Sequence, residues 1–235
     1  MSKVLVIPDV HLKPWMFDKA EEILKEKECD RIVCLGDIPD DWDQEHNQDL
    51  YNETFDRAIE FAREHQNLFI CWGNHDMSYV WEEMESGYSS FARETVVRGL
   101  RELRDSLPDG NCGFIHLVDN VLFTHGGLTV SFVMEHFGSI GASIEYIVNA
   151  INGMWRKKLW KDDSPLWARP QNGYRLYPFD MVHVVGHTPV ENITCCDNVI
   201  STDVFSTYRD GTPIGDQRFI IIDTETKEFT EVATD

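Results

Sequence analysis

Five short polar blocks, each placed directly after a run of apolar residues, constrain this chain more than any other feature. The runs are short and rich in Val, Ile, Leu and Phe, which is typical of buried strands. The blocks that follow them are Asp9–His11, Gly36–Asp40, Gly73–Asp76, Thr124–Gly127 and Gly186–Pro189. If the strands lie side by side, their loops converge at one edge of the sheet, where ligands bind in open α/β sheets. We therefore expect His, Asp and Asn side chains to gather at that edge.

Strands and helices alternate in the first part of the predicted structure. Strands are expected at 3–7, 31–35 and 68–72, and helices at about 16–27, 50–65, 80–85 and 91–107. After Pro108 we expect a hairpin of 114–117 with 121–124, a helical stretch near 140–160, and strands at 181–185, 199–202, 218–223 and 228–232. Alternation followed by hairpins favours a central mixed sheet, or two packed sheets, with helices outside.

Length and composition limit the organisation of the chain. Its 235 residues are 42% hydrophobic, which suffices for a substantial core, and no linker, low-complexity stretch or repeat divides them. We expect a single domain that spans residues 1–235. No segment approaches the roughly 20 consecutive apolar residues that a membrane-spanning helix needs, and the N-terminus does not resemble a secretory signal. Six scattered cysteines without a Cys-x-x-Cys pair favour a cytoplasmic protein without disulfides.

The charge balance excludes one class of partner. The chain has 21 basic and 41 acidic residues, for a net charge of −20. Such a surface repels nucleic-acid backbones, so we expect no nucleic-acid binding. We also expect no membrane association, and the sequence leaves the oligomeric state open.

The residue types in the five blocks are those that hold metal ions. Asp9 and His11 are two residues apart, so at the end of an extended strand they point the same way and can hold one ion. Asp37 has two carboxylate oxygens and can bridge two ions. Further donors come from Asn74, His125 and His187. Nitrogen and oxygen donors without a thiolate suit Mn, Fe or Zn. Two divalent ions that share Asp37 would lie about 3.5–4 Å apart, a separation used to polarise phosphoryl groups and to make hydroxide at neutral pH.

The order of the blocks resembles a known family. Asp-x-His, Gly-Asp-x-x-Asp, Gly-Asn-His-Asp, His-Gly-Gly and Gly-His-Thr-Pro look like the motifs of the calcineurin-like metallophosphoesterases, over roughly residues 3 to 223. The blocks 125–128 and 186–189 look most like the phosphoprotein phosphatase branch, of the serine/threonine, phage and bacterial type. One block alone is weak evidence, but five in order are specific. The resemblance implies a four-layer α/β/β/α sandwich with a binuclear metal site at the carboxyl ends of the strands.

The resemblance also implies which residues hold the two ions. The first ion would be held by Asp9, His11 and Asp37. The second ion would be held by Asp37, Asn74, His125 and His187, with Asn74 also contacting the substrate phosphate. Manganese is the ion expected at both places, with iron or zinc as alternatives.

His75 and Asp40 carry the catalytic roles that the resemblance implies. His75 would be the general acid that protonates the leaving alkoxide, and Asp40 would orient it and raise its pKa. Proton donation near neutral pH suits histidine. The nucleophile would be a hydroxide bridging the metals, which attacks phosphorus directly. For Asp40, a helix N-cap or a loop carboxylate is the alternative.

The chain departs from the family pattern at several positions. Asp41 and Trp42 stand where protein phosphatases usually have Arg and Gly, and Leu12 stands where they have Gly. Pro189 replaces a histidine that other branches have, so the first ion is expected to complete its shell with water. Arg169 resembles a phosphate-contacting arginine of the phage and bacterial members, and a guanidinium matches phosphate geometry. A structural salt bridge is the alternative for Arg169.

Three functions fit this pattern. The first is a metal-dependent phosphomonoesterase of protein-phosphatase type, acting on a phosphoprotein, a small phosphomonoester or a nucleotide. The second is a dinucleoside polyphosphate hydrolase or a cyclic-nucleotide phosphodiesterase with the same metal core. The third is a non-catalytic scaffold with this fold. Scaffolds of this kind usually lack the acid histidine or some ligands, and here every position is filled, which argues against the third.

Overall fold

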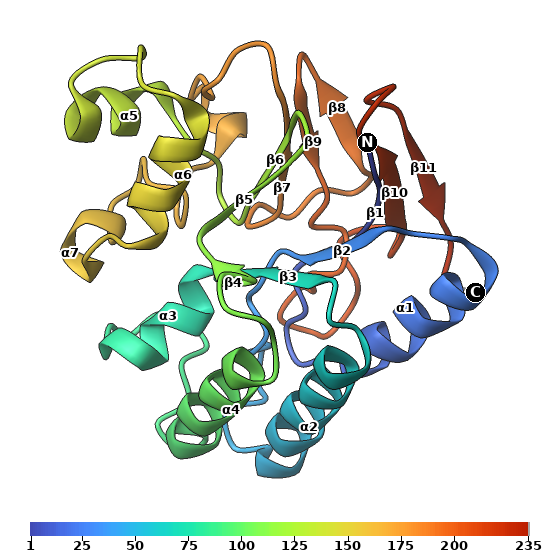
Figure 1. Ribbon diagram of the computed structural model, residues 1–235. Helices are drawn as coiled ribbons and strands as arrows, with labels where there is room; N and C mark the ends of the chain where they lie inside the picture. Colours follow the sequence, from blue (N-terminus) through green and yellow to red (C-terminus); the bar gives the residue numbers. More distant parts are fainter. Residues whose placement is uncertain (235) are drawn as a thin grey trace.

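A computed structural model describes residues 1–234 as two packed β-sheets with helices on their outer sides (Figure 1). The first sheet contains, in spatial order, β11 (Phe229–Val232), β10 (Phe219–Asp223), β1 (Lys3–Ile7), β2 (Arg31–Cys34), β3 (Leu68–Cys71) and β4 (Cys112–Gly113). The second sheet contains β5 (Ile115–Val118), β6 (Val121–Thr124), β7 (Val182–Val185), β9 (Val199–Ser201) and β8 (Thr194–Cys196). The chain therefore forms the α/β/β/α sandwich that the resemblance implied.

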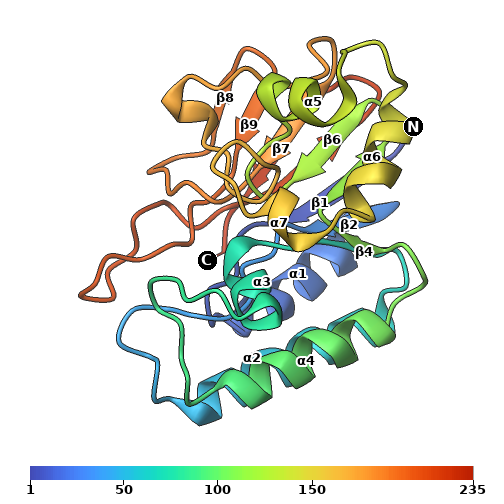
Figure 2. The ribbon, with the colours of Figure 1, turned by 90° about the vertical axis from the view of Figure 1, so that its left-hand side faces the viewer.

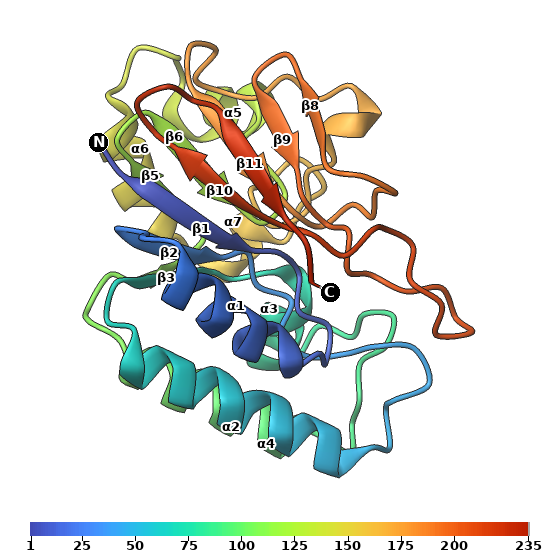
Figure 3. The ribbon, with the colours of Figure 1, turned by 90° about the vertical axis from the view of Figure 1, so that its right-hand side faces the viewer.

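The helices bury apolar faces against the two sheets. Below the first sheet in Figure 1 lie α1 (Trp15–Glu26), α2 (Gln48–Glu64) and α4 (Arg93–Asp105), with α2 packed along α4 as Figure 3 shows. Beside the second sheet lie α5 (Val130–Phe137), α6 (Ile144–Asn152) and α7 (Arg156–Leu159) (Figure 2). In α1 the buried residues Met16, Phe17, Ala20 and Ile23 recur at helical spacing, because only one stripe of the helix faces the sheet.

The parallel strands of both sheets end at the same edge of the molecule. In the first sheet, β1, β2 and β3 run parallel to one another. In the second sheet, β6, β7 and β9 do the same. The five polar blocks follow β1, β2, β3, β6 and β7. Three blocks therefore come from the first sheet and two from the second, and they meet where the sheets face each other.

The structure corrects some of the predicted helices. The helix expected at about 80–85 is wrong. Instead, α3 (Asn74–Trp81) begins inside the third polar block and ends where Glu82 adopts a left-handed conformation, with φ of 59°. The side chain of Asp76 accepts a hydrogen bond from Gly73 N at 2.8 Å and caps the first turn. The stretch expected near 140–160 is divided at Gly153 into α6 and α7, and α5 was not expected.

The other predictions for the elements agree with the structure. The hairpin pairs β5 with β6 in antiparallel register, with Val118 opposite Val121. Two short strands, β4 and β8, were not predicted, since β4 has only two residues and β8 is exposed along its length. One hydrophobic cluster contains buried residues of both sheets, among them Leu5 and Phe123. Across residues 1–234, none of the helices is both long enough and apolar enough to span a bilayer.

Candidate metal centre

The six side chains predicted as metal ligands lie together at the shared edge, in two overlapping groups. The first candidate ion position is formed by Asp9, His11 and Asp37, whose possible ligand atoms lie within 4.8 Å of one another. The second candidate ion position is formed by Asp37, His125 and His187, whose possible ligand atoms also lie within 4.8 Å of one another. Asn74 lies beside them. Asp37 belongs to both positions, as a bridging carboxylate must.

Four atoms with lone pairs converge at the second ion position. His125 Nε2 lies 3.1 Å from Asn74 Oδ1, 3.1 Å from His187 Nδ1 and 3.2 Å from Asp37 Oδ2. The other ring nitrogen, Nδ1, donates to the carbonyl oxygen of Leu35 at 2.8 Å, so Nε2 of the neutral ring carries no proton. A cation placed between these four atoms would be held by all of them. A divalent metal ion with nitrogen and oxygen ligands fits this arrangement, and the Leu35 contact is the usual support of a ligating histidine.

The histidine of the first ion position is also oriented by a hydrogen bond to a backbone carbonyl. His11 Nδ1 donates to the carbonyl oxygen of Asp40 at 2.8 Å, which leaves Nε2 facing Asp37 Oδ2 at 3.8 Å. Asp9 Oδ2 accepts a hydrogen bond from His187 N at 2.8 Å. Asp9 Oδ1 is buried and has no hydrogen-bond partner among residues 1–234. An orphaned buried carboxylate oxygen is rare in folded proteins, and a metal ion would satisfy it.

The backbone at this edge is tightly folded. Four non-glycine residues of the site adopt left-handed conformations, with φ values of 43°, 45°, 68° and 63° at His11, Asp37, Asp40 and His187. Each such residue costs about 1–3 kcal/mol, and such strain is concentrated at functional sites. Two glycines make room for the ligands: a Cβ on Gly186 would collide with the Asp9 carboxylate, and a Cβ on Gly73 would collide with the Asp37 carboxylate.

A histidine and a fully bonded carboxylate lie beside the ion positions. His75 Nδ1 lies 2.9 Å from Asp40 Oδ2. The other oxygen, Asp40 Oδ1, accepts hydrogen bonds from the hydroxyls of Tyr51, at 2.8 Å, and of Tyr79. Asp40 is therefore the partner of His75, and α2 is capped by Asn47 instead. The two tyrosines were not predicted, because they lie inside helices, 11 and 39 residues from Asp40, where no local pattern marks the contact.

Charge at the edge favours a cation. Burial raises the pKa of Asp9, and the neighbouring carboxylate of Asp203 raises it further. Burial lowers the pKa of His125, but the charge of Asp37, followed by that of Asp9, outweighs it and raises the value to about 10. Burial likewise lowers the pKa of His75, but Asp37 and the hydrogen bond to the partner carboxylate raise it to about 9. The carboxylates thus stabilise positive charge on His125 and on His75.

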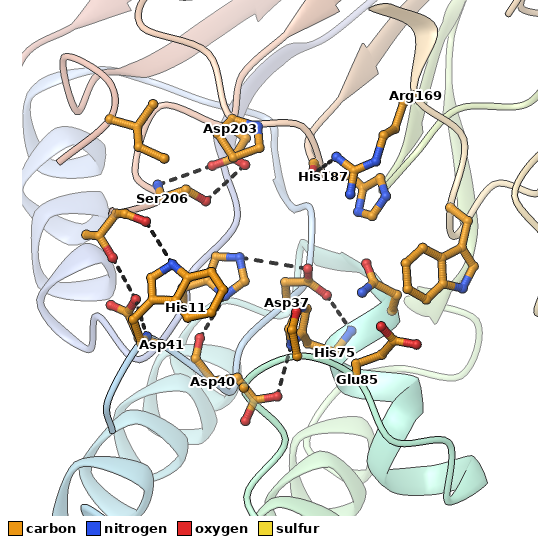
Figure 4. Close-up of a pocket in the computed structure, with 18 residues that line it drawn as sticks. His11, Asp37, Asp40, Asp41, His75, Glu85, Arg169, His187, Asp203 and Ser206 are labelled. Carbon is orange, nitrogen blue, oxygen red and sulfur yellow. Dashed lines mark hydrogen bonds and ion pairs between the residues drawn. The ribbon is translucent and has the colours of Figure 1, made fainter. Parts of the chain in front are cut away.

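A cavity of ≈ 240 Å³ opens over both ion positions (Figure 4). Asn74, His75 and Arg169 line it, together with Trp42 and Trp167. Arg169 Nη1 donates to the carbonyl oxygen of His187 at 3.1 Å and to the hydroxyl of Thr188 at 3.2 Å. No carboxylate lies within 4.0 Å of its guanidinium in the described part of the chain, so Arg169 forms no salt bridge there.

The acidic residue that replaces the family's arginine is neutralised by a lysine. Asp41 Oδ2 pairs with Lys13 Nζ at 2.9 Å, and Asp41 Oδ1 accepts a hydrogen bond from Thr207 Oγ1 at 2.7 Å. Lys13 Nζ also donates to the carbonyl oxygen of His11 at 2.9 Å. Sequence reasoning missed this lysine. The pair joins the loop of the first ion position to the loop that contains Thr207.

Two further carboxylates at the edge were missed by sequence reasoning. Asp76 Oδ2 accepts a hydrogen bond from Asp37 N at 2.9 Å, and Asp76 Oδ1 accepts one from Ile38 N at 3.0 Å, so it anchors the loop of the bridging ligand. Asp203 lines the cavity and comes directly after the strand predicted at 199–202, two residues beyond the end of β9. It repeats the pattern of the five blocks, so the same signal could have found it.

Comparisons with known proteins identify the family of the chain. A family model described as calcineurin-like phosphoesterase matches residues 2–210. No curated protein matches the chain. The structure of a protein serine/threonine phosphatase from Saccharomyces cerevisiae, with similarity to human phosphatase PP5, is similar at 15% identity; the match covers 99% of this chain and 80% of that chain, with a TM-score of 0.56. A metallophosphoesterase from Sphaerobacter thermophilus matches at 17% identity over 98% of this chain and 88% of that chain, with a TM-score of 0.49.

Proposed function

This chain belongs to the calcineurin-like phosphoesterase family, whose members are hydrolytic enzymes, and on that premise we propose that it is a phosphomonoesterase of protein-phosphatase type. We propose two divalent ions as cofactors, with manganese the expected metal. The observation that carries this proposal is the convergence of lone pairs around His125 Nε2, next to a second group of donors that shares Asp37. Such sharing is what a pair of neighbouring ions requires.

The ions and the residues around them are suited to the hydrolysis of a phosphate ester. Bound divalent ions would polarise the phosphoryl group and lower the pKa of water. Arg169 lines the cavity and uses Nη1 for two protein contacts, which leaves its other N–H groups free to bind phosphate oxygens. Asn74 lines the cavity between the second ion position and His75, and we propose that it also contacts the phosphate.

His75 is placed to supply the proton that the leaving group needs. It lines the cavity, and its Nδ1 is held by Asp40, so Nε2 is the atom left to act on substrate. A pKa of about 9 keeps the ring protonated at neutral pH. We propose that His75 donates this proton to the leaving oxygen, and that Asp40 fixes the ring for the transfer.

A substrate panel tests the proposal. Hydrolysis of p-nitrophenyl phosphate, bis-p-nitrophenyl phosphate, phosphopeptides and diadenosine tetraphosphate is measured with added Mn²⁺, with EDTA, and with Mn²⁺ in excess over EDTA. We expect the monoesters to be the preferred substrates, EDTA to abolish hydrolysis and Mn²⁺ to restore it. Faster hydrolysis of the diester or the dinucleotide would favour the second function considered from the sequence. Activity that EDTA does not reduce would contradict the metal mechanism. The absence of activity on every substrate would favour a scaffold.

We also propose a reducing, cytoplasmic location. All six cysteines are free, and two adjacent ones lie exposed in β8. Burial raises the pKa of the Cys112 thiol to about 12 and raises that of Cys29, which makes both poor thiolates. Free cysteines are the rule in compartments that keep thiols reduced.

A further inference from the structure

Asp203 is a carboxylate at the shared edge of the two sheets, and the proposed mechanism gives it no role. It lies two residues after the end of β9, and β9 runs parallel to β7, the strand that precedes His187. Thr202 fixes its place: both its backbone N–H, at 2.9 Å, and its hydroxyl, at 3.0 Å, donate to the carbonyl oxygen of Val185. Asp203 is therefore held at the end of the second sheet, beside the start of the loop that contains His187.

The Asp203 side chain is buried without a balancing positive charge. Its exposure is 1%. Among residues 1–234 its carboxylate accepts hydrogen bonds from Ser206 alone, whose N–H lies at 3.2 Å and hydroxyl at 3.0 Å. No Lys, Arg or His nitrogen lies within 4.0 Å of it among residues 1–234. A carboxylate has about four lone-pair sites, so two neutral hydrogen bonds leave others unused. Buried charges of this kind are paired with a cation or bind a metal.

Asp203 lies on the side of the cavity that holds the first candidate ion position. Asp203 and His11 line the same cavity, and Figure 4 shows the Asp203 carboxylate directed into it from the wall above His11. That position has three protein donors, in Asp9, His11 and Asp37, whereas the second position has four. Pro189, which also lines the cavity, contributes no donor there. The first position therefore has one protein ligand fewer than the second.

We propose that Asp203 is the fourth protein group of the first ion position and that it sets the affinity of that position for its cation. Its carboxylate either binds the ion or accepts a hydrogen bond from a water ligand of the ion, and both contacts stabilise the bound cation. With three carboxylates and one imidazole, the first position is rich in oxygen. Such a donor set suits Mn²⁺. This inference rests on the proposed function, which requires two ions.

Manganese binding to the chelator-stripped protein tests the inference without relying on activity. Free Mn²⁺ is followed by electron paramagnetic resonance during titration of the unaltered protein and of Asp203→Asn, which keeps the size and the contacts to Ser206. The unaltered protein is expected to bind two equivalents. In Asp203→Asn one of the two is expected to bind about 10–100-fold more weakly, as is usual when a group that supports a metal ligand set is removed. The other equivalent keeps its affinity.

Glu85→Gln is the matched control, because Glu85 is an acidic lining residue on the other side of the cavity in Figure 4. It is expected to bind both equivalents as the unaltered protein does. Equal weakening in both variants would show a general effect of cavity charge and overturn the inference, as would two unchanged equivalents in Asp203→Asn. If Asp203→Asn fails to fold by circular dichroism, Ser206→Ala replaces it, and unchanged affinity there overturns the inference. No manganese binding by the unaltered protein would instead refute the proposed function.

Discussion

At the scale of single residues, Asp40 shows how a carboxylate is positioned to hold the histidine that we propose as the general acid. Its two oxygens accept hydrogen bonds from three side chains, and two of these are the hydroxyls of Tyr51 and Tyr79. Both phenols act on Oδ1, so Oδ2 is left for His75 alone. Burial, reinforced by the Asp40 charge, raises the pKa of both tyrosines, which therefore stay neutral donors.

Replacing His75 with alanine tests its role as a proton donor. We expect kcat to fall by about 10²–10⁴-fold, the usual contribution of general acid catalysis, while the manganese content of the protein stays unchanged. His46→Ala is the control, because His46 is an exposed histidine outside the cavity lining. If His75→Ala loses manganese, the residue is a ligand and the proposed role is wrong.

Replacing Asp40 with asparagine is expected to shift the pH dependence of kcat. His75 must be protonated to act, so activity is full below its pKa, which is raised to about 9, and falls as the pH rises through that value. The variant removes the hydrogen bond and the charge of Asp40, which both raise this pKa, so the alkaline limb should move to lower pH. Rate profiles of the two proteins between pH 5 and pH 10, taken in about unit steps, measure the shift. An alkaline limb that does not move would mean that another group controls it.

At the scale of elements, the loops after six strands supply the side chains of the site. Glycines in these loops determine how closely one loop approaches another. Gly186 follows β7, and its missing side chain leaves the space that the Asp9 carboxylate fills. The contact joins the end of the second sheet to the end of β1 in the first. The approach of the two loops thus depends on a position without a Cβ.

Gly186→Ala is expected to disturb this contact. The added methyl group must displace the Asp9 carboxylate, so we expect weaker manganese binding and a loss of about 1–3 kcal/mol in the free energy of unfolding. Gly141→Ala is the control, since a Cβ there meets only Ser139 Oγ, at 3.7 Å. Calorimetry and manganese titration compare the two variants. Unchanged manganese affinity in Gly186→Ala would show that the glycine has no part in placing Asp9.

The strands could be predicted from sequence because each is a short apolar run buried on both faces, as β1 and β7 are. The start of α3 could not, because its first turn is made of the polar block itself and is capped by Asp76. The ligands were found because each follows its strand directly. Tyr51 and Tyr79 were missed because they reach Asp40 from positions 11 and 39 residues away, and no local pattern marks such a contact.

At the scale of the whole molecule, the two sheets are joined by a shared core and by a shared metal edge. The hydrophobic cluster contains residues of both sheets, which supports the proposal of a single domain. The second ion position takes Asp37 and Asn74 from the first sheet and His125 and His187 from the second. Ions bound there would therefore stabilise the packing of one sheet on the other.

Removing the metal is expected to lower the melting temperature. An ion at 100 times its Kd adds about 2.7 kcal/mol to the free energy of unfolding. For a chain of this size each kcal/mol raises Tm by about 2–4 °C, so each ion should contribute about 5–10 °C. Calorimetry with Mn²⁺ and with EDTA measures the difference, and a single transition is expected in both. Equal melting temperatures would mean that no ion links the sheets.

The most direct test of the account is the anomalous diffraction of crystals grown with Mn²⁺. We expect two manganese peaks about 3.5–4 Å apart, the separation of ions that share a carboxylate. One should lie against Asp9 and His11, the other against Asn74, His125 and His187, with Asp37 between them. A single peak, or none at this edge, would contradict the binuclear site on which the proposed function depends.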